Sequence, residues 1–225
     1  MTKKYPTVYE KGKDLYEIFS QVEDKPNKIF NFLTKKFNFK NKIILDLGCG
    51  SGKYIPFFAP LAKKYFALDA GKKLLKIAKE KAKPFNNVKI IHAFAQKIPL
   101  PKNSVDIIIS TWALSAMNFI DMREKALKEC LRVLKKPGHI ILVENNHEGN
   151  LQKIFGYNPN PYEFNYQHWL KGKGFTLTKK IKTYFEFKNL KQAKACMTAI
   201  FRRDVAQRIK NKKVTHDVVI LSKRK

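Results

Sequence analysis

Short apolar runs of strand length recur through the middle of the chain, separated by stretches with apolar residues at helical spacing. The predicted strands cover residues 42–47, 65–69, 88–95, 105–110 and 139–144. Between them, the pattern predicts a helix from about Lys53, an amphipathic helix over 72–83 and a third helix over 122–134. Strands that alternate with helices pair in parallel through right-handed crossovers, so we predict a doubly wound α/β fold.

The two ends of the chain depart from this alternation. Near the N-terminus, apolar side chains recur at helical spacing between Ile29 and Phe37 and predict one helix. After residue 150 the expected order is a helix over 162–171, a strand over 175–187, a helix over 190–208 and a strand over 214–221. The last two strands lack the earlier rhythm, so we expect them to end the sheet as a hairpin-like pair.

A glycine-rich turn after the first predicted strand carries the most informative chemistry. Its sequence is Asp46-Leu47-Gly48-Cys49-Gly50-Ser51-Gly52, and a predicted helix follows it. Glycines let the backbone turn tightly and approach a ligand, and the start of a helix offers free N–H groups. Asp69 ends the next predicted strand, 19 residues after Gly50, where an acid binds ribose hydroxyls in doubly wound folds.

The glycine spacing favours a nucleoside without phosphates over a dinucleotide. The dinucleotide fingerprint is GxGxxG, whereas Gly48, Gly50 and Gly52 give GxGxG and Lys53 comes next. A nicotinamide oxidoreductase is therefore disfavoured. The same residues also fit a simpler interpretation, in which the glycines form only a tight turn and Asp69 caps the helix that follows.

Further segments, in the same order along the chain, complete a family resemblance. Ala93 to Pro99, Asn103 to Asp106 and Arg132 to Gly138 follow the glycine turn and Asp69. Together they resemble a class I S-adenosylmethionine-dependent methyltransferase of the type 11 group, over roughly residues 40–145. The resemblance implies S-adenosylmethionine as the cofactor and a Rossmann-like seven-stranded sheet, mostly parallel with the last strand antiparallel.

The resemblance also assigns cofactor contacts to individual residues. It places Gly48 and Gly50 beneath the methionine part of the cofactor, Asp46 near the amino group and Asp69 at the ribose hydroxyls. The backbone N–H of Ala95 faces the adenine ring. The complete predicted cofactor set is Asp46, Gly48, Cys49, Gly50, Gly52, Asp69, Ala70, Phe94, Ala95, Gln96 and Ser110.

Phe94 departs from the family pattern. The family usually has an acid at this position, just before Ala95, in contact with the adenine amino group. Phe94 can stack on the adenine, or it can point into the core while Gln96 makes the polar contact. Cys49, inside the glycine turn, is read from its type alone as a small buried hydrophobe.

The chemistry of methyl transfer needs little help from side chains, because an in-line displacement depends mainly on positioning. By resemblance, Ser110 and Thr111 face the donor methyl and the acceptor, and Tyr9 closes over the methionine carboxylate. A general base is required only where the acceptor stays protonated. Candidates are His147, Glu144 and Tyr9, the last beside Tyr5. Two tryptophans, Trp112 and Trp169, fit an acceptor pocket or the core equally well.

Charge is the most unusual feature of the composition. The net charge is +28, lysine supplies 40 of the 46 cations, and residues 151–225 alone carry +14. Such a field attracts polyanions, although a lysine-rich surface with few arginines is a weaker nucleic-acid signal than an arginine-rich one. The basic final third therefore keeps RNA open as a partner.

Cysteine use and hydropathy predict the compartment. The three cysteines, Cys49, Cys130 and Cys196, are widely spaced, so we expect neither a disulfide framework nor a metal site. No apolar run approaches the ~20 residues of a membrane helix, and no secretory signal is apparent. We expect a cytoplasmic protein without a membrane partner.

We predict a single methyltransferase domain over residues 1–225. It comprises an N-terminal cap segment (1–41), a cofactor-binding core (42–150) and a basic C-terminal part (151–225) that completes the sheet.

The leading functional hypothesis is transfer of a methyl group to a small molecule. RNA methylation, of tRNA in particular, and a non-catalytic cofactor-binding partner subunit are the alternatives. A small-molecule enzyme predicts an enclosed apolar pocket beside Ser110 and Trp112, whereas an RNA enzyme predicts lysines around the cofactor mouth. The oligomeric state is not predicted.

Overall fold

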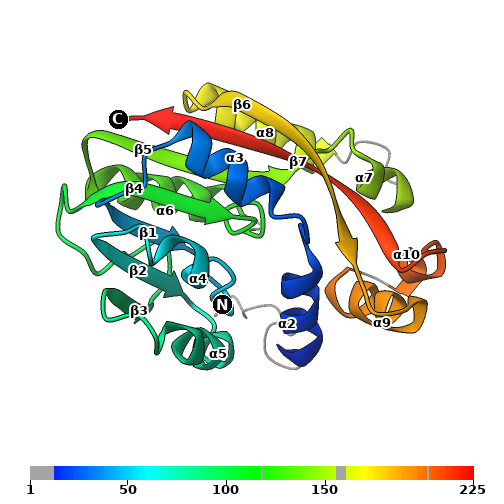
Figure 1. Ribbon diagram of the computed structural model, residues 1–225. Helices are drawn as coiled ribbons and strands as arrows, with labels where there is room; N and C mark the ends of the chain where they lie inside the picture. The colour runs from blue at the N-terminus through cyan, green and yellow to red at the C-terminus, as the bar shows by residue number, and fades with distance from the viewer. Residues whose placement is uncertain (1–12, 118, 156–160, 202) are drawn as a thin grey trace.

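The computed structural model describes residues 13–117, 119–155, 161–201 and 203–225, and contains one seven-stranded sheet with the strand order β3-β2-β1-β4-β5-β7-β6 (Figure 1). The strands are β1 (Ile43–Leu47), β2 (Lys64–Asp69), β3 (Val88–His92), β4 (Val105–Thr111), β5 (Leu134–Asn145), β6 (Thr176–Glu186) and β7 (Lys213–Arg224). Strands β1 to β5 are parallel, and β7 runs antiparallel to both β5 and β6. The prediction of a doubly wound sheet that ends in an antiparallel pair is confirmed.

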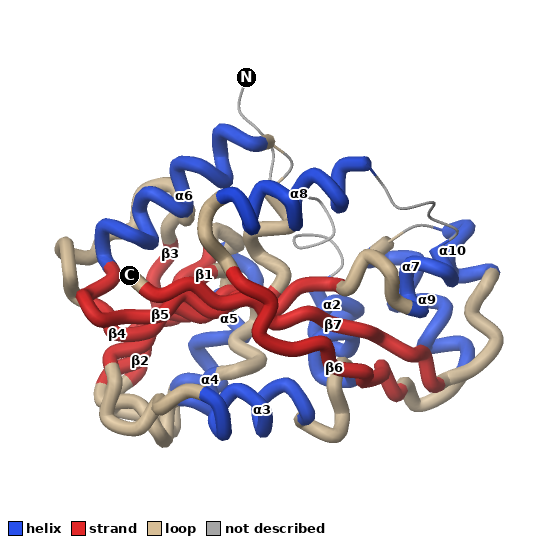
Figure 2. Tube along the Cα trace, turned by 90° about the horizontal axis from the view of Figure 1, so that it is seen from above, coloured by secondary structure: helices blue, strands red, loops and turns tan. Residues whose placement is uncertain are grey.

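Helices cover both faces of this sheet, as Figure 2 shows, with α6 and α8 on one side and α3 and α4 on the other. The helices are α2 (Lys13–Val22), α3 (Lys28–Lys36), α4 (Ile55–Phe58), α5 (Lys72–Ala82), α6 (Ile120–Val133), α7 (Asn150–Phe155), α8 (Pro161–Gly172), α9 (Leu190–Ile200) and α10 (Arg203–Gln207). Within the described residues, no helix combines the length and the apolar character that crossing a membrane requires.

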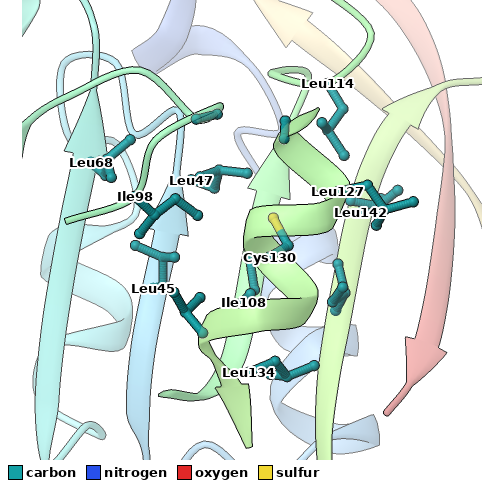
Figure 3. Packing of buried hydrophobic residues seen from close by; sticks show 14 of the residues in the cluster. Leu45, Leu47, Leu68, Ile98, Ile108, Leu114, Leu127, Cys130, Leu134 and Leu142 are labelled. Carbon is teal, nitrogen blue, oxygen red and sulfur yellow. The ribbon is translucent and has the colours of Figure 1, made fainter. Parts of the chain in front are cut away.

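Two buried clusters hold the layers together, one on each face of the sheet. On the first face, α6 and α8 pack on side chains from β1, β2, β4 and β5. Figure 3 shows Leu127 and Cys130 of α6 close to Ile108 and Leu142 of the strands. On the second face, α3, α4 and α5 pack on the alternate strand residues. A strand buried on both faces is apolar throughout, which explains the continuous apolar runs in the sequence.

A third cluster lies beyond the parallel part of the sheet. Phe185 of β6, Phe187 just after this strand and Val214 of β7 pack with α9, α10 and Leu151 of α7, and side chains of α2 lie against them. Segments from both ends of the described chain therefore meet here. This cluster adds a wall next to the carboxyl ends of the parallel strands.

Several element boundaries differ from the predicted ones. β3 ends at His92 rather than residue 95, because the chain turns there into a loop in which Lys97 N–H bonds to the carbonyl of Phe94. β5 starts at Leu134, directly after α6, where Leu134 pairs with Val105 of β4. The helix expected from Lys53 is the short α4, and the helix expected over 190–208 is divided into α9 and α10.

The helix α2 is absent from the sequence-based prediction. Its apolar residues Leu15, Ile18, Phe19 and Val22 have helical spacing and pack on the third cluster, so the signal was present in the sequence. Only the helix later in the N-terminal segment, found as α3, was predicted.

Candidate active site at the carboxyl ends of the parallel strands

A cavity of about 460 Å³ opens where β1, β2 and β4 end, within the size range of small-molecule sites. One part, the glycine-loop half, is lined by Gly48, Cys49, Gly50, Leu68, Asp69, Ala70, Leu74 and residues 93–96. The other part, the aromatic half, is lined by Tyr16, Phe19, Glu23, Lys53, Trp112, Asn145, Leu151, Phe185, Ile200, Phe201 and His216. The two halves belong to one continuous cavity, so ligands in them are neighbours.

The glycine turn folds so that its backbone forms one wall. Gly48 has φ +78°, and a Cβ there would lie 2.3 Å from the Cβ of Ala113, so a side chain does not fit. The N–H groups of Gly48 and Cys49 both bond to the carbonyl of Leu68. The glycine turn that follows β1 is thereby fixed to the end of β2.

The carboxylate of Asp69 joins the two strand–helix turns. Its Oδ2 accepts from Gly50 N–H at 2.9 Å and its Oδ1 accepts from Gly71 N–H at 2.7 Å. A carboxylate offers about four lone-pair positions, so capacity remains for a ligand hydroxyl. Asp69 lies at the cavity wall, and its contact with a ribose stays a prediction. It also accepts from Gly71, the residue that precedes the first turn of α5.

Asp46 is buried beside this turn and has an incomplete set of partners. Tyr65 Oη–H donates to its Oδ2 at 2.7 Å, whereas Oδ1 has no partner among the described residues. Burial raises the pKa of Asp46 to about 7, against the hydrogen bond from Tyr65 that lowers it, and nearby Asp69 raises it further. A ligand amino group would satisfy Oδ1 and stabilise the carboxylate. Asp46 itself is not part of the cavity wall.

Residues 93–96 form the far end of the glycine-loop half. Phe94 is 58% exposed and lines the cavity, so it does not point into the core. Ala95 is buried at the wall, and Gln96 Nε2 lies 3.9 Å from the sulfur of Met117. The aromatic face of Phe94 is therefore available at the rim, where the family carries an acid.

Other predicted cofactor residues lie around the wall or behind it. Cys49 and Ala70 line the cavity, and burial raises the pKa of the Cys49 thiol well above its usual range. Gly52 and Ser110 are not in the wall. Ser110 is fully buried, while the next residue, Thr111, lines the cavity. Successive side chains of a strand point to opposite faces, which separates these two.

The predicted general bases are not in the cavity wall. Glu144 is buried, accepts from Tyr166 Oη–H at 2.8 Å, and has its pKa raised to about 7 by burial. His147 has its Nε2 4.0 Å from Glu148 Oε1 and does not line the cavity. Tyr9, like Tyr5, lies outside the described residues. The two tryptophans separate as well, since Trp112 lines the cavity whereas Trp169 packs against Tyr166.

The aromatic half contains a polar cluster that the sequence did not reveal. Lys53 Nζ lies 3.0 Å from Glu23 Oε2 and also donates to the Glu23 carbonyl at 2.9 Å. Glu23 Oε1 lies 3.3 Å from His216 Nδ1, and His216 Nε2 lies 2.8 Å from Asn145 Oδ1. Trp112 Nε1–H donates to the same oxygen at 2.9 Å. We define these five residues as the Glu23 cluster.

Apolar side chains line the rest of the aromatic half. Phe19 stacks on Phe185 with ring centroids 4.7 Å apart and meets Phe201 edge-on at 5.7 Å. Leu151 and Ile200 complete this wall. Among the described residues that line the cavity, Lys53 is the sole lysine or arginine, and it is paired with Glu23. The arrangement suits a largely apolar ligand with few polar groups.

Comparisons with known proteins agree with this site. The family model of the type 11 methyltransferase domain matches residues 45–142, which contain the glycine turn, Asp69 and β4. YcgJ of Bacillus subtilis strain 168, named an uncharacterized methyltransferase, is 36% identical over 104 residues, covering 45% of this chain and 40% of that protein. UbiE of Campylobacter jejuni strain 81-176, a ubiquinone/menaquinone biosynthesis C-methyltransferase, is 30% identical over 158 residues, covering 60% and 65%.

Solved structures show the same fold across almost the whole chain. The YcgJ crystal structure has a TM-score of 0.61 at 19% identity and covers 87% of this chain and 97% of that one. A SAM-dependent methyltransferase from Aquifex aeolicus has a TM-score of 0.59 at 20% identity and covers 97% and 99%. The sequence alignments, in contrast, span less than two thirds of YcgJ and UbiE. The glycine turn, the family match and the strand order together show that residues 45–142 match the type 11 methyltransferase domain, within a sheet of the class I methyltransferase fold.

Proposed function

We propose that the protein transfers the methyl group of S-adenosylmethionine to a small-molecule acceptor. The observation that supports this proposal is the continuous cavity, in which the glycine-loop half adjoins the aromatic half. When bound, S-adenosylmethionine supplies a methyl group on a positively charged sulfur, which is a good leaving group.

The residues of the glycine-loop half fit this cofactor. Gly48 and Gly50 present backbone without side chains to the methionine part, and Asp46, buried beside the turn, has an oxygen, Oδ1, that lacks a donor. Asp69 offers its remaining lone pairs to the ribose hydroxyls, and Ala95 offers its N–H to the adenine. These contacts are the roles expected from the family resemblance.

The end of β4 lies where the two halves meet. Thr111, Trp112 and Ala113 line the cavity there. An acceptor in the aromatic half would be held near the methyl group, and such positioning supplies much of the acceleration in displacement reactions. Of the two residues predicted to face the donor methyl and the acceptor, Ser110 and Thr111, only Thr111 lines the cavity.

The charge of the cavity favours a small molecule over RNA. The overall charge of +28 attracts polyanions, but a site for a phosphate backbone needs unpaired cations at its mouth. Lys53 is paired with Glu23, and the other side chains around the aromatic half are mostly apolar. UbiE, which is similar to this chain, is named for quinone biosynthesis and so for a small-molecule pathway.

Calorimetry tests the donor half of the proposal. Titration with S-adenosylmethionine and with S-adenosylhomocysteine should give heat for the wild type and about tenfold or weaker binding for Asp69→Ala, which loses charge-assisted hydrogen bonds. Asp106→Ala is the matched control, because Asp106 starts β4 at the opposite end of the sheet. Absence of heat for the wild type would instead support a non-catalytic role.

Transfer of a radiolabelled methyl group tests the acceptor. Label should enter a small-molecule extract and not total RNA. Incorporation into RNA, with a steep loss of activity as salt is raised, would replace this proposal with the RNA alternative.

A further inference from the structure

We propose that Glu23 is the general base of the aromatic half and that the acceptor is an apolar molecule presenting one weakly acidic hydroxyl group. The inference rests on the proposed methyltransferase function and names the acceptor class and a catalytic residue for it. Glu23 follows α2 and lines the cavity with a side chain that is 6% exposed.

Lys53 holds one oxygen of the Glu23 carboxylate, and His216 faces the other. Lys53 Nζ lies 3.0 Å from Oε2 and His216 Nδ1 lies 3.3 Å from Oε1. The backbone is fixed as well, because Glu23 forms a bridge with Phe185 of β6 and its carbonyl accepts from Lys53. A carboxylate oxygen offers more than one lone pair, so both oxygens retain capacity for an acceptor hydroxyl.

The hydrogen bonds of the cluster define which nitrogen of His216 carries its proton. The indole N–H of Trp112 is only a donor, so the atom of Asn145 that it contacts is the amide oxygen. His216 Nε2 shares that oxygen and must therefore donate to it. Burial lowers the pKa of His216 to about 3, as does Lys53, so the ring is neutral and its Nδ1 is a lone pair facing Glu23.

This arrangement prepares a place for a proton on Glu23. Once Oε1 is protonated, its hydrogen can be donated to the Nδ1 lone pair of His216, 3.3 Å away. Burial raises the pKa of Glu23 and the neighbouring Asp24 raises it too, while Lys53 lowers it. Tyr54 also lies near Glu23, and burial keeps it neutral by raising its pKa well above the usual range. A carboxylate with a raised pKa is a stronger proton acceptor at neutral pH.

The surroundings of Glu23 define the acceptor. Phe19, Phe185 and Phe201 form an apolar wall that fits a planar hydrophobic body. The Lys53–Glu23 pair is neutral as a whole, so the site favours an acceptor that arrives uncharged. A hydroxyl is such a group, and it becomes a good nucleophile only when its proton is removed.

The O–H bond of the acceptor breaks and its proton moves to Glu23, while Lys53 remains close to the oxygen that gains negative charge. The acceptor oxygen forms a bond to the methyl carbon as the carbon–sulfur bond breaks, and that electron pair stays on sulfur. The proton on Glu23 is held by His216 until it is lost to solvent.

A structural role alone explains this cluster less well. A buried ion pair contributes little net stability, because desolvation of the charges offsets their attraction. The helix α2, which directly precedes Glu23, has an ion pair of its own, Glu17 Oε1 to Lys81 Nζ at 2.6 Å, that ties it to α5 without lining the cavity. Glu17→Gln is therefore a matched control for Glu23→Gln, with the same substitution on the same segment.

The test uses umbelliferone, a fluorescent aromatic with a single weakly acidic hydroxyl, and its methyl ether herniarin. Binding is measured by fluorescence with S-adenosylhomocysteine present, and methyl transfer to umbelliferone is measured with radiolabelled S-adenosylmethionine. The wild type should prefer umbelliferone over herniarin by about tenfold or more, as a charge-assisted hydrogen bond predicts. Glu23→Gln should reduce this preference to about threefold or less and slow methyl transfer by about 100-fold or more.

The pH profile separates a base from a structural residue. The wild-type rate should rise with pH as Glu23 ionises and then level off, and Glu23→Gln should lose this limb. Glu17→Gln should keep the limb and a rate within about threefold of the wild type. Glu23→Asp retains the charge beside Lys53, and should keep the limb at a rate about tenfold lower because the carboxylate is set back. Glu23→Asp replaces Glu23→Gln as the test variant if Glu23→Gln does not fold.

The outcomes distinguish this inference from the proposed function. If S-adenosylmethionine gives no heat, the methyltransferase proposal itself fails. If the cofactor binds but umbelliferone does not, or if Glu23→Gln transfers the methyl group with an unchanged pH profile, only the assignment of Glu23 and its acceptor class is overturned.

Discussion

Replacing Asp46 by asparagine should make the ligand-free protein more stable at alkaline pH and at the same time weaken cofactor binding. The pKa of this buried carboxyl is about 7 in the folded protein, against an ordinary value of 3.8. One pKa unit corresponds to about 1.4 kcal/mol, so ionising Asp46 costs the folded protein about 4 kcal/mol once the pH exceeds both values.

The sign follows from which state holds the proton more tightly. Because the folded protein retains this proton to a higher pH than the unfolded chain does, the associated stability is complete below about pH 4. It declines as the pH rises and is lost at about pH 7, with a loss of about 2–3 kcal/mol between pH 5 and pH 8. Asparagine does not titrate, and its amide oxygen can still accept from Tyr65, so Asp46→Asn should not show this decline.

Urea unfolding of both ligand-free proteins at pH 5 and pH 8 measures the effect. The free energy of unfolding of the variant minus that of the wild type should increase by about 2–3 kcal/mol over this range, since other titrating groups contribute equally to both. Asp106→Asn should show no such slope, because hydrogen bonds from Ile43 N–H and Lys135 hold the pKa of Asp106 below its usual range. If the free energies of unfolding of Asp46→Asn and the wild type differ by the same amount at pH 5 and pH 8, the raised pKa of Asp46 is refuted.

Calorimetry completes the prediction for Asp46. Removing the negative charge should weaken S-adenosylmethionine binding by about 10–100-fold at pH 8, the range for loss of a hydrogen bond to a charged group. Unchanged affinity would mean that the unpartnered Oδ1 does not receive the amino group of the cofactor.

Two further substitutions probe the glycine-loop half. Gly48→Ala adds a Cβ 2.3 Å from that of Ala113, at a φ of +78°, so cofactor affinity should fall at least about tenfold. The shift in melting temperature caused by S-adenosylhomocysteine measures this loss. Gly172→Ala is the control, because nothing lies within 4 Å of a Cβ added there. Phe94→Ala removes a side chain that is 58% exposed, so the melting temperature of the ligand-free protein should change little. Cofactor affinity should fall about tenfold, because stacking on adenine is lost. Equal affinity would show that Phe94 does not stack on the adenine.

The glycine-loop half could be predicted because its signals are local in the sequence. An apolar strand, a glycine turn and a following helix are adjacent in the chain, and Asp69 occupies the equivalent end of the next strand. Parallel strands bring their carboxyl ends to the same edge of the sheet. The contact between these residues can therefore be predicted without knowledge of the rest of the fold. The contact of Asp69 with Gly50 N–H is the direct result.

A shift of one residue limits such predictions at strand ends. Ser110 and Thr111 both follow from the position of β4, but only Thr111 lines the cavity. Because side chains alternate between faces, a prediction that is correct to within one residue along the chain can still select the wrong face.

The Glu23 cluster could not be predicted in this way. Glu23 follows α2, Asn145 ends β5 and His216 lies in β7, so the three residues are brought together only by the antiparallel end of the sheet. A single histidine in a strand and a single acid after a helix are common in any sequence. Their contact depends on the long-range pairing of β7 with β5 and β6, and no sequence motif predicts that pairing.

Lys53 connects the two halves of the cavity, because its backbone adjoins the glycine turn and its side chain reaches the aromatic half. It directly follows Gly52 of the glycine turn, and its Nζ holds Glu23 in the aromatic half. The helix α2 returns from there to the turn, where the Tyr16 hydroxyl lies 2.7 Å from the point that a Cβ on Gly50 would occupy. The backbone that shapes the glycine-loop half therefore also sets the position of the proposed base. Changes that relax the glycine turn should consequently disturb both halves, even where the substituted residue contacts only the donor.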